Sequence, residues 1–223
     1  FLLGQRSATQ WTCLAKPAKR LRKDDTIIFS DYLSATVIEK NTHLLLDFNF
    51  SGDFYEHLNR DGEVPLPPYI KVHDPATFQQ RYQTIYASER GSVAAPTAGL
   101  HFTPMLLDQL RSQGVLVEEI TLHVGYGTFK PIDAASLHDH EMHEERFRIK
   151  AETAKRLNQY RLEGKRIIAV GTTSTRALES AASSSHKLKP GDQVSNLFIS
   201  PGYKFNFVQS MITNFHLPKS SLL

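Results

Sequence analysis

Short runs of β-branched, aliphatic and aromatic residues alternate with charged turns over the first fifty residues. Four such runs, at residues 9–14, 26–29, 35–39 and 43–50, have the length and spacing of strands in a small antiparallel barrel or sandwich. Residues 1–4 resemble the inside or the end of a further strand. A short helix is predicted over residues 52–59, with Ser51 at its start. The pattern therefore predicts a mainly β unit at the beginning of the chain.

The pattern changes after a proline-rich stretch at residues 65–68, where Pro65, Pro67 and Pro68 occupy three of four positions. Proline cannot donate to a sheet or continue a helix, so we place a domain boundary here, between residues 1–66 and 67–223. Beyond it, helices are predicted at 74–86, 104–113, 151–163 and 174–184. Strands are predicted at 115–124, 166–170, 194–199, 203–208 and 211–216. This alternation predicts an α/β (α+β mixed) fold with a mixed or largely parallel sheet covered by helices.

Composition narrows the class of protein only slightly. A net charge of +3 does not by itself indicate a nucleic-acid binder, and the longest apolar runs are only as long as strands. A single cysteine, Cys13, excludes an internal disulfide and a cysteine-only metal site and is typical of a reducing compartment. With no signal peptide or spanning segment in view, we expect a cytoplasmic protein without membrane contact. The chain starts without methionine and stops as an apolar stretch begins, so we expect it to be truncated at both ends.

Two of the candidate ligand-binding segments are rich in small residues. Residues 94–102 include Thr97, Gly99 and His101, and small side chains let backbone amides approach a ligand closely, although a tightly packed loop has the same composition. Residues 122–129 form a strand that ends in a glycine-flanked turn, a common ligand position at the edge of an α/β sheet. The candidates in this second segment are His123, Gly125, Gly127 and Thr128. The turn is not a GxGxxG fingerprint, and an ordinary tight turn remains an alternative.

The densest polar run lies at residues 138–145, which contain three histidines and four carboxylates. Histidine is suited to proton transfer near neutral pH, so a catalytic role is one interpretation. A polar surface loop is another. A metal-dependent hydrolase is the third, but His140 and His143 are one residue closer together than in the HExxH motif.

A further candidate is the strand–glycine–hydroxyl segment at residues 170–176. A buried strand, Gly171, Thr172 and Thr173 lead into a helix that carries Arg176 and Glu179. This arrangement is typical of an anion- or ribose-binding corner, whereas a capped helix with a surface ion pair is the alternative.

Two weaker signals are polar residues at the end of the chain and a basic cluster near its beginning. Asn214 and His216 end an apolar strand, where a histidine is more often part of the core. A basic cluster could contact RNA phosphates, either in an enzyme or in a non-catalytic RNA-binding module; a charged turn offset by two aspartates is the simpler alternative. The cluster consists of Lys16, Lys19, Arg20, Arg22 and Lys23.

Seven strings along the chain, taken in order, resemble the S-adenosylmethionine:tRNA ribosyltransferase-isomerase family of queuosine synthesis. They are PLPPYI at 65–70, YQTIYA at 82–87, VAAPTAGLHFT at 93–103, TLHVGYGTF at 121–129, DHEMHEE at 139–145, IAVGTTSTRALES at 168–180 and TNFHLP at 213–218. The resemblance implies a small antiparallel β-barrel domain inserted into a larger α/β domain, with further family segments before Phe1 and after Leu223.

The resemblance also implies the chemistry. The substrate would be a tRNA with a GUN anticodon carrying 7-aminomethyl-7-deazaguanine at the wobble position, and S-adenosylmethionine would be the co-substrate that donates its ribosyl group. The products would be epoxyqueuosine in tRNA, adenine and methionine. No metal and no other cofactor are expected, and the enzyme would be a monomer.

Under this resemblance we assign roles to the candidate residues. Proton transfer falls to His101 or His143, with Asp139 and Glu144 as their orienting or charge partners. Contacts to the ribosyl or methionine portion fall to Thr172, Thr173 and Arg176. The donor pocket would be lined by Gly125, Gly127 and Thr128 and bounded by Asn214 and His216. The rest of the binding set is Thr97, Gly99, His123 and Glu179, and the basic cluster at residues 16–23 would contact tRNA.

Overall fold

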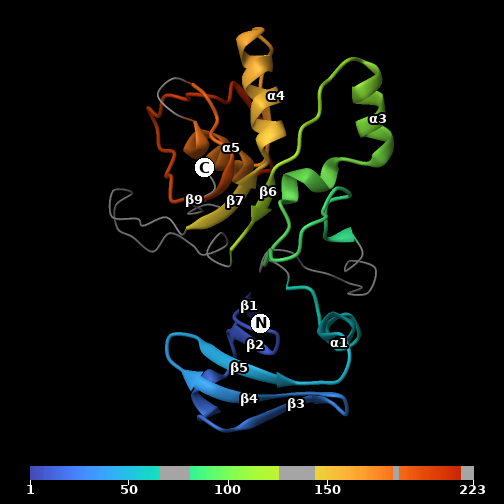
Figure 1. Ribbon diagram of the computed structural model, residues 1–223, viewed down its shortest axis with the longest axis vertical. Helices are drawn as coiled ribbons and strands as arrows, with labels where there is room; N and C mark the ends of the chain where they lie inside the picture. The colour runs from blue at the N-terminus through green and yellow to red at the C-terminus, as the bar shows by residue number, and fades with distance from the viewer. Residues whose placement is uncertain (66–80, 126–143, 183–185, 217–223) are drawn as a thin grey trace. The chain divides into compact units, whose positions relative to one another are not determined.

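The computed structural model describes residues 1–65, 81–125, 144–182 and 186–216 (Figure 1). The chain divides into two compact units, Phe1–Lys71 and Val72–Leu223, and each is described by itself. The boundary expected between residues 66 and 67 lies in a stretch outside the described residues, as does most of the helix expected at 74–86.

The first unit is built on a five-stranded antiparallel sheet with the order β1-β2-β5-β4-β3. Its strands are β1 (Leu2–Gln5), β2 (Gln10–Cys13), β3 (Thr26–Ser30), β4 (Leu33–Lys40) and β5 (Leu44–Asn49). A 3₁₀ turn, η1 (Ala18–Arg20), lies between β2 and β3. Within the described part of this unit, the edge strands β1 and β3 do not pair with each other. The antiparallel character is therefore confirmed, but the expected closed barrel is not found and the sheet is open.

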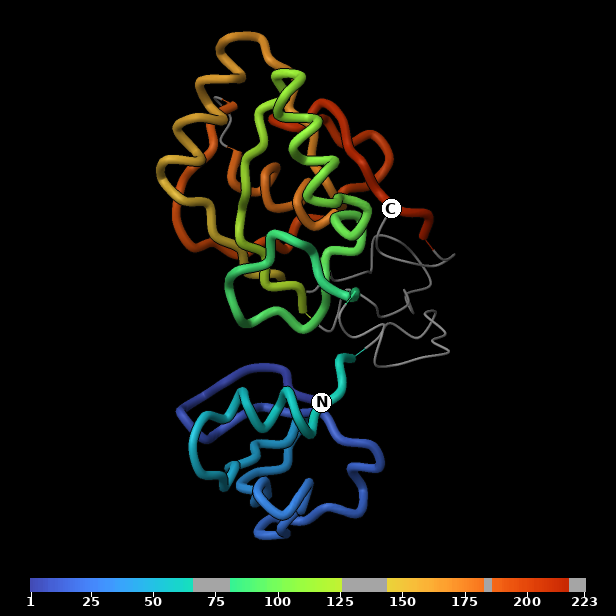
Figure 2. Tube along the Cα trace, turned by 90° about the vertical axis from the view of Figure 1, so that its right-hand side faces the viewer, coloured from blue at the N-terminus to red at the C-terminus, as the bar shows by residue number. Residues whose placement is uncertain are grey.

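Alternation of side chains explains how this sheet forms its core. In β4, Leu33, Ala35 and Val37 point inward with partly buried or exposed residues between them, and β5 repeats the alternation. Helix α1 (Phe54–Asp61) covers the buried face (Figure 2), where the Phe54 ring lies 5.0 Å from that of Phe48. The expected helix start at Ser51 is two residues early, because the Asp53 carboxylate accepts the Tyr55 amide at 3.0 Å and caps the helix.

The second unit combines two small sheets with helices. An antiparallel sheet has the order β6-β7-β9, and β8 pairs in parallel with β10. The strands are β6 (Thr121–His123), β7 (Glu145–Ile149), β8 (Ile168–Val170), β9 (Gly191–Ser195) and β10 (Ser210–Ile212). The helical elements are η2 (Thr97–His101), α3 (Pro104–Ser112), α4 (Ala151–Leu162) and α5 (Thr172–Ala181). A mixed α/β fold is thus confirmed, although its strands form separate antiparallel and parallel sheets in the described residues.

One core joins the two sheets of this unit to α4 and α5. Phe147 and Ile149 from β7 pack in the same cluster as Leu157 from α4, Leu178 from α5 and Phe207. Figure 1 shows α4 and α5 against β7 and β9. Within the described residues, no helix has the length and apolar character needed to cross a bilayer.

Four strand predictions in this unit differ from the structure. The strand expected at 211–216 is Ser210–Ile212, so Asn214 and His216 lie after its end. Of residues 115–124 only Thr121–His123 form a strand, and the strand expected at 194–199 lies earlier, at Gly191–Ser195. Residues 203–208 are not a strand, because the amides of Phe207 and Val208 donate to the buried carboxylate of Glu179 instead of to a neighbouring strand. The helix start at Thr103 is confirmed, since its hydroxyl accepts the Leu106 amide at 3.1 Å.

Candidate functional site

The carboxyl ends of the two parallel strands bring two polar segments to one edge. β8 and β10 run in register, with Ile212 opposite Val170, and the Gly171 amide donates to the Ile212 carbonyl at 2.8 Å. The segment after β8 enters α5, and the segment after β10 carries Thr213, Asn214 and His216. Ligands of open α/β folds bind at this edge, outside the carboxyl ends of parallel strands. The structure therefore joins two segments that are about forty residues apart in the sequence.

The N-terminus of α5 has no side-chain cap. Gly171 is its N-cap residue, with φ at +95°, a conformation that strongly favours glycine. A glycine cap leaves the first amides of the helix without a side-chain acceptor, and the helix dipole favours negative charge there. Thr172 is half-buried, whereas the hydroxyl of Thr175 bonds to the Gly171 carbonyl at 3.1 Å. Thr172 is thus the hydroxyl of this corner best placed to meet a ligand, since Thr173 is buried.

Asn214 links the end of β10 to η2. Its amide nitrogen donates to the Thr97 hydroxyl at 2.8 Å, and its Oδ1 lies 2.8 Å from Nε2 of His101. With the amide oriented in this way, Oδ1 is an acceptor and His101 donates from Nε2, which leaves Nδ1 as the basic nitrogen. His101 is exposed. Asn214 thus holds His101 in the tautomer protonated at Nε2, and the basic Nδ1 lies on the side of the ring away from Asn214.

The segment before η2 connects this edge to the end of β6. The Val93 amide donates to the Val124 carbonyl at 2.9 Å, and the Val124 amide donates to the Ser92 hydroxyl at 3.0 Å. At the other end of the segment, Ala98 packs against the Gly171 corner: a β-carbon built on Gly171 would lie 3.9 Å from the Ala98 β-carbon. Residues 92–101 therefore contact the end of β6, the Gly171 corner and Asn214, and bring these three sequence-predicted segments into one site.

Gly99 is needed because another of the matched strings packs on it. A β-carbon at Gly99 would lie 2.2 Å from the Tyr86 hydroxyl oxygen and 2.7 Å from Cγ2 of Thr84. Burial, and then the nearby charge of Glu119, raise the pKa of Tyr86, so this hydroxyl stays protonated. The role assigned to Gly99 in ligand binding stays a prediction; the contact shows a packing role.

We therefore expect Gly99→Ala to destabilise the second unit by about 1–3 kcal/mol, the usual cost of overpacking. Urea denaturation measures this change. In the Gly99→Ala background, Tyr86→Phe should recover part of the loss because it removes the closest atom. A Gly99→Ala variant as stable as the parent would contradict the packing role.

Arg176 and Glu179 are buried in protein contacts of their own. Arg176 donates to a Glu145 carboxylate oxygen at 2.6 Å and to the Leu197 carbonyl at 2.8 Å, and burial lowers its pKa, with Glu145 opposing the shift. The Glu179 carboxylate accepts three backbone amides and the Tyr203 hydroxyl. Burial and the Glu179 charge raise the pKa of Tyr203 to about 12. The alternative of a surface ion pair between Arg176 and Glu179 is wrong, since both are buried and each has other partners.

Glu145 is a structural residue that our sequence reasoning placed in a catalytic run. Residues 145–149 alternate buried and exposed, so the carboxylate occupies an inward position of β7. The alternation in Glu145-Arg146-Phe147-Arg148-Ile149 is a strand signal that was available in the sequence. The pairing of this carboxylate with Arg176, which is 31 residues away in the sequence, could not be predicted from the sequence.

The remaining predicted residues fall in three groups. Asp139, His143, Gly127 and Thr128 lie outside the described residues. Glu144 is exposed and its carbonyl would lie 4.0 Å from a β-carbon at Gly125, so these two are close together. His216 is half-buried, with Nε2 3.5 Å from the Thr213 hydroxyl. Among the described residues no group of three or more histidine, cysteine or acidic side chains could hold a metal ion.

The basic cluster lies in the first unit, around η1. All five of its side chains are exposed, and none forms an ion pair with a carboxylate of the described residues. The Asp25 carboxylate instead accepts the backbone amide of Arg22 at 2.7 Å. The turn is therefore held by its aspartate through the backbone, and its cations remain available to a polyanion.

Comparison with known proteins identifies relatives along the whole chain. Residues 1–223 match the model of a family described as queuosine biosynthesis protein. Two relatives, from Desulforamulus reducens and Pelotomaculum thermopropionicum, are each 45% identical over 226 residues and are named S-adenosylmethionine:tRNA ribosyltransferase-isomerase. The match covers 100% of this chain and 66% of each relative, so the chain spans somewhat less than two-thirds of their length.

A solved structure is also similar. It is the crystal structure of an S-adenosylmethionine tRNA ribosyltransferase from Thermotoga maritima, 26% identical, with a TM-score of 0.42. The likeness covers 99% of this chain and 60% of that one. The family assignment is carried by the sequence matches.

Proposed function

Because the chain belongs to the queuosine biosynthesis protein family, we propose that it transfers and isomerises the ribosyl group of S-adenosylmethionine onto tRNA. The acceptor is 7-aminomethyl-7-deazaguanine at the wobble position of a GUN anticodon, and the products are epoxyqueuosine-tRNA, adenine and methionine. We further propose a cytoplasmic monomer that uses no metal or resident cofactor, with the first unit as an insert in the larger domain.

The observation that carries this proposal is the convergence of η2, the α5 N-terminus and the end of β10. Thr97, His101 and Asn214 are joined by two hydrogen bonds of 2.8 Å, and Ala98 of the same turn packs on Gly171. The reaction needs a base, an acid for the departing adenine, and groups that orient a dihydroxylated ribose. This edge offers an imidazole in a fixed tautomer, hydroxyls and uncapped helix amides within one small region.

Each of these groups matches a step of the transfer. The sulfonium of S-adenosylmethionine acidifies its C5′ protons, and Nδ1 of His101 is proposed to remove one of them. The amides at the start of α5 and the Thr172 hydroxyl would hold the polar atoms of the ribosyl or methionine portion. The exocyclic amine of the deazaguanine then forms the new bond to the ribosyl carbon, as adenine and methionine leave. His143, Asp139, Gly127 and Thr128 are kept in the proposal as assigned from the resemblance.

The burial of Arg176 and Glu179 changes the role that we propose for each of them. Arg176 links α5 to Glu145 of β7 and to the Leu197 carbonyl. Glu179 binds the amides of Phe207 and Val208 and so holds this segment against α5. We propose that both position the corner and that Arg176 does not contact the donor. The exposed basic cluster of the first unit is proposed to contact tRNA phosphates.

The direct test is incubation of the protein with S-adenosylmethionine and tRNA carrying 7-aminomethyl-7-deazaguanine. We expect release of free adenine and the mass of epoxyqueuosine in the digested tRNA. Because the relatives are longer, the same assay is run on this chain and on a chain extended to their length. Adenine release without a new nucleoside, or neither product from either protein, would contradict the proposed function.

A further inference from the structure

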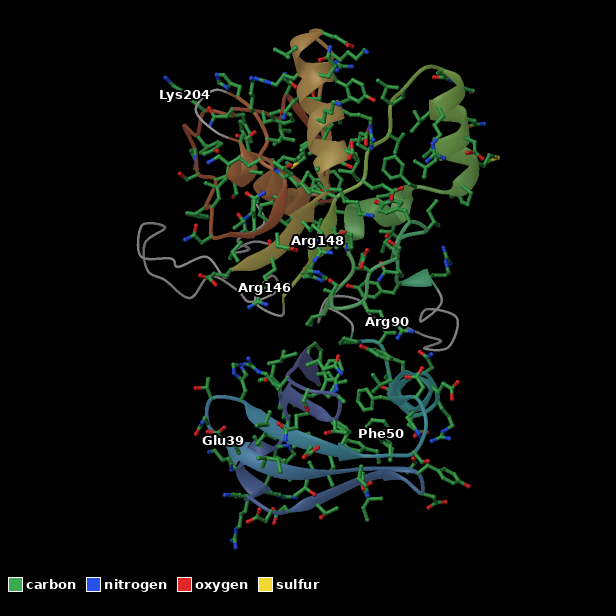
Figure 3. All side chains as sticks on the ribbon, in the orientation of Figure 1. Glu39, Phe50, Arg90, Arg146, Arg148 and Lys204 are labelled. Atoms are coloured by element: carbon green, nitrogen blue, oxygen red, sulfur yellow. The ribbon has the colours of Figure 1, made fainter. Side chains whose placement is uncertain are left out.

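The outer face of the β6-β7-β9 sheet carries cationic side chains that differ in their pairing. Arg146 and Arg148 are both exposed and lie two residues apart on β7, so they project from the same face (Figure 3). Arg148 forms an ion pair of 2.6 Å with Asp192 of β9, and Glu89 also lies near enough to favour its charged form. Arg146 has no carboxylate within ion-pair distance among the described residues. One cation of this face is therefore neutralised and its neighbour is not.

His123 lies directly opposite Arg146. The β6–β7 register pairs these two residues, which places their side chains on one face about 5 Å apart at Cβ. Nδ1 of His123 is buried without a hydrogen-bond partner in the described residues, and the backbone at Gly91 covers it: a β-carbon built on Gly91 would lie 3.0 Å from this nitrogen. Since Nδ1 is closed off, Nε2 is the ring nitrogen left to meet a ligand.

A histidine nitrogen and a guanidinium that pairs with no carboxylate of the described residues lie on the same face and form a site for an oxyanion. The guanidinium offers several N–H donors in a fixed plane, which matches the geometry of a phosphate, and Nε2 adds a further donor. Arg90, exposed and next to Gly91, brings another cation to the adjoining segment (Figure 3). Two carboxylates, Asp192 and Glu89, are also near this face; both act on Arg148, and Asp192 lies near enough to His123 for the two charges to interact.

We propose that Arg146 and His123 bind a backbone phosphate of the tRNA substrate, a role that replaces the donor-binding role assigned to His123 from the resemblance; this rests on the proposed function. A polyanion is favoured over the small donor because the pair lies on an exposed sheet face, beside Val194, whose side chain is also exposed. His123 is also connected to the candidate site along the chain. Val124 follows it and hydrogen-bonds to Ser92 and Val93, in the segment that ends at His101. The tRNA backbone would thus be anchored on β6 and β7, next to the edge where the wobble base reacts.

The test compares tRNA binding by the parent with that by Arg146→Ala, Arg146→Lys and His123→Gln over a range of salt concentrations. Arg146→Ala should raise the Kd for a tRNA with a GUN anticodon about tenfold and reduce the slope of log Kd against log salt by about one. Arg146→Lys keeps the charge, so its slope should stay unchanged while its affinity falls about threefold. His123→Gln should weaken binding about threefold. The kcat at saturating tRNA should stay within about twofold of the parent for Arg146→Ala.

Arg148→Ala is the matched control, because it removes an exposed arginine from the same strand and face that is already neutralised by Asp192. Its effect on the Kd should be less than about twofold. Equal effects of Arg146→Ala and Arg148→Ala would overturn the proposal and indicate general surface charge. Weaker S-adenosylmethionine binding with an unchanged tRNA salt slope would also overturn it, since the anion would then be the donor carboxylate.

Failure of this proposal is separable from failure of the proposed function. If the parent forms epoxyqueuosine and Arg146→Ala binds tRNA like the parent, only the phosphate site is wrong. If the parent neither binds tRNA nor releases adenine, both are wrong.

Discussion

Replacing His101 by alanine is expected to lower kcat by about a hundredfold to ten-thousandfold, the usual contribution of a general acid or base. His101 is exposed, and among the described residues its side chain bonds to Asn214 alone, so its loss should leave folding intact. The affinity for tRNA should change by less than about twofold, because the imidazole is assigned to proton transfer at the donor. Single-turnover formation of epoxyqueuosine, with tRNA binding measured in parallel, separates the two effects.

The role of Asn214 provides a second readout of the same prediction. Asn214→Ala should reduce kcat less than His101→Ala does, because the imidazole remains but is no longer held in one tautomer. A carboxylate in Asn214→Asp would stabilise the protonated imidazolium, so the acidic limb of the kcat–pH profile should move to higher pH. His186→Ala is the matched control, since His186 is also exposed in this unit and, within the described residues, its ring bonds to the Asn206 carbonyl alone. A His101→Ala variant with parental kcat would exclude His101 as the base.

The largest effect on stability is expected from Arg176→Leu, which should destabilise the second unit by about 3–5 kcal/mol. The change leaves the Glu145 carboxylate buried, with a side-chain exposure of 4%, and without the guanidinium that lies 2.6 Å away. The removal of the cation beside a buried carboxylate, and not the loss of a favourable surface pair, is the reason for the size of the effect. Urea denaturation followed by circular dichroism gives the free energy of unfolding.

A double variant tests that reason. If the cost comes from the stranded charge, Arg176→Leu with Glu145→Leu should recover most of the stability. Arg148→Ala breaks an exposed pair of the same kind on the same strand and should cost less than about 1 kcal/mol. A loss below about 1 kcal/mol for Arg176→Leu would contradict the account of Arg176 as the residue that fastens α5 to β7.

The sequence predicted best those elements whose signals are local. Thr103 and Pro104 predicted the start of α3, and the strand-forming run at residues 35–39 predicted most of β4, because caps and strand propensity depend on neighbouring residues alone. Local signals could not predict that the first sheet is open and does not close into a barrel. Whether β1 meets β3 depends on the curvature of the whole sheet, which no single strand encodes.

Residues 203–208 show why a local pattern can fail. Their aromatic and aliphatic side chains predict a strand, yet the amides of Asn206, Phe207 and Val208 donate to the carboxylate of Glu179, which is 27 to 29 residues away in the sequence. The pairing of Glu145 with Arg176 was missed for the same reason, because the two residues are far apart in the sequence, and both seemed available for a ligand. Buried charge pairs between distant segments are set by tertiary packing.

The candidate site was predicted as separate segments and not as an arrangement. Thr97, His101 and Asn214 were each named from their surroundings, but nothing in the sequence indicated that Asn214 bridges the other two. That link depends on the parallel pairing of β8 with β10, which brings Gly171 and Asn214 to the same edge. The residues at 126–143, which include His143 and Asp139, lie outside the described residues, so their roles stay predictions.

The most direct test of the central claim follows the atoms of the donor. S-adenosylmethionine is labelled with ³H at ribosyl carbons other than C5′, whose proton is removed in the proposed reaction, and with ¹⁴C in the methyl group, and tRNA carrying 7-aminomethyl-7-deazaguanine is recovered after incubation. We predict that ³H enters the tRNA in step with adenine release while ¹⁴C leaves in methionine. Transfer of ¹⁴C to the tRNA, or adenine release without ³H in the tRNA, would contradict ribosyl transfer.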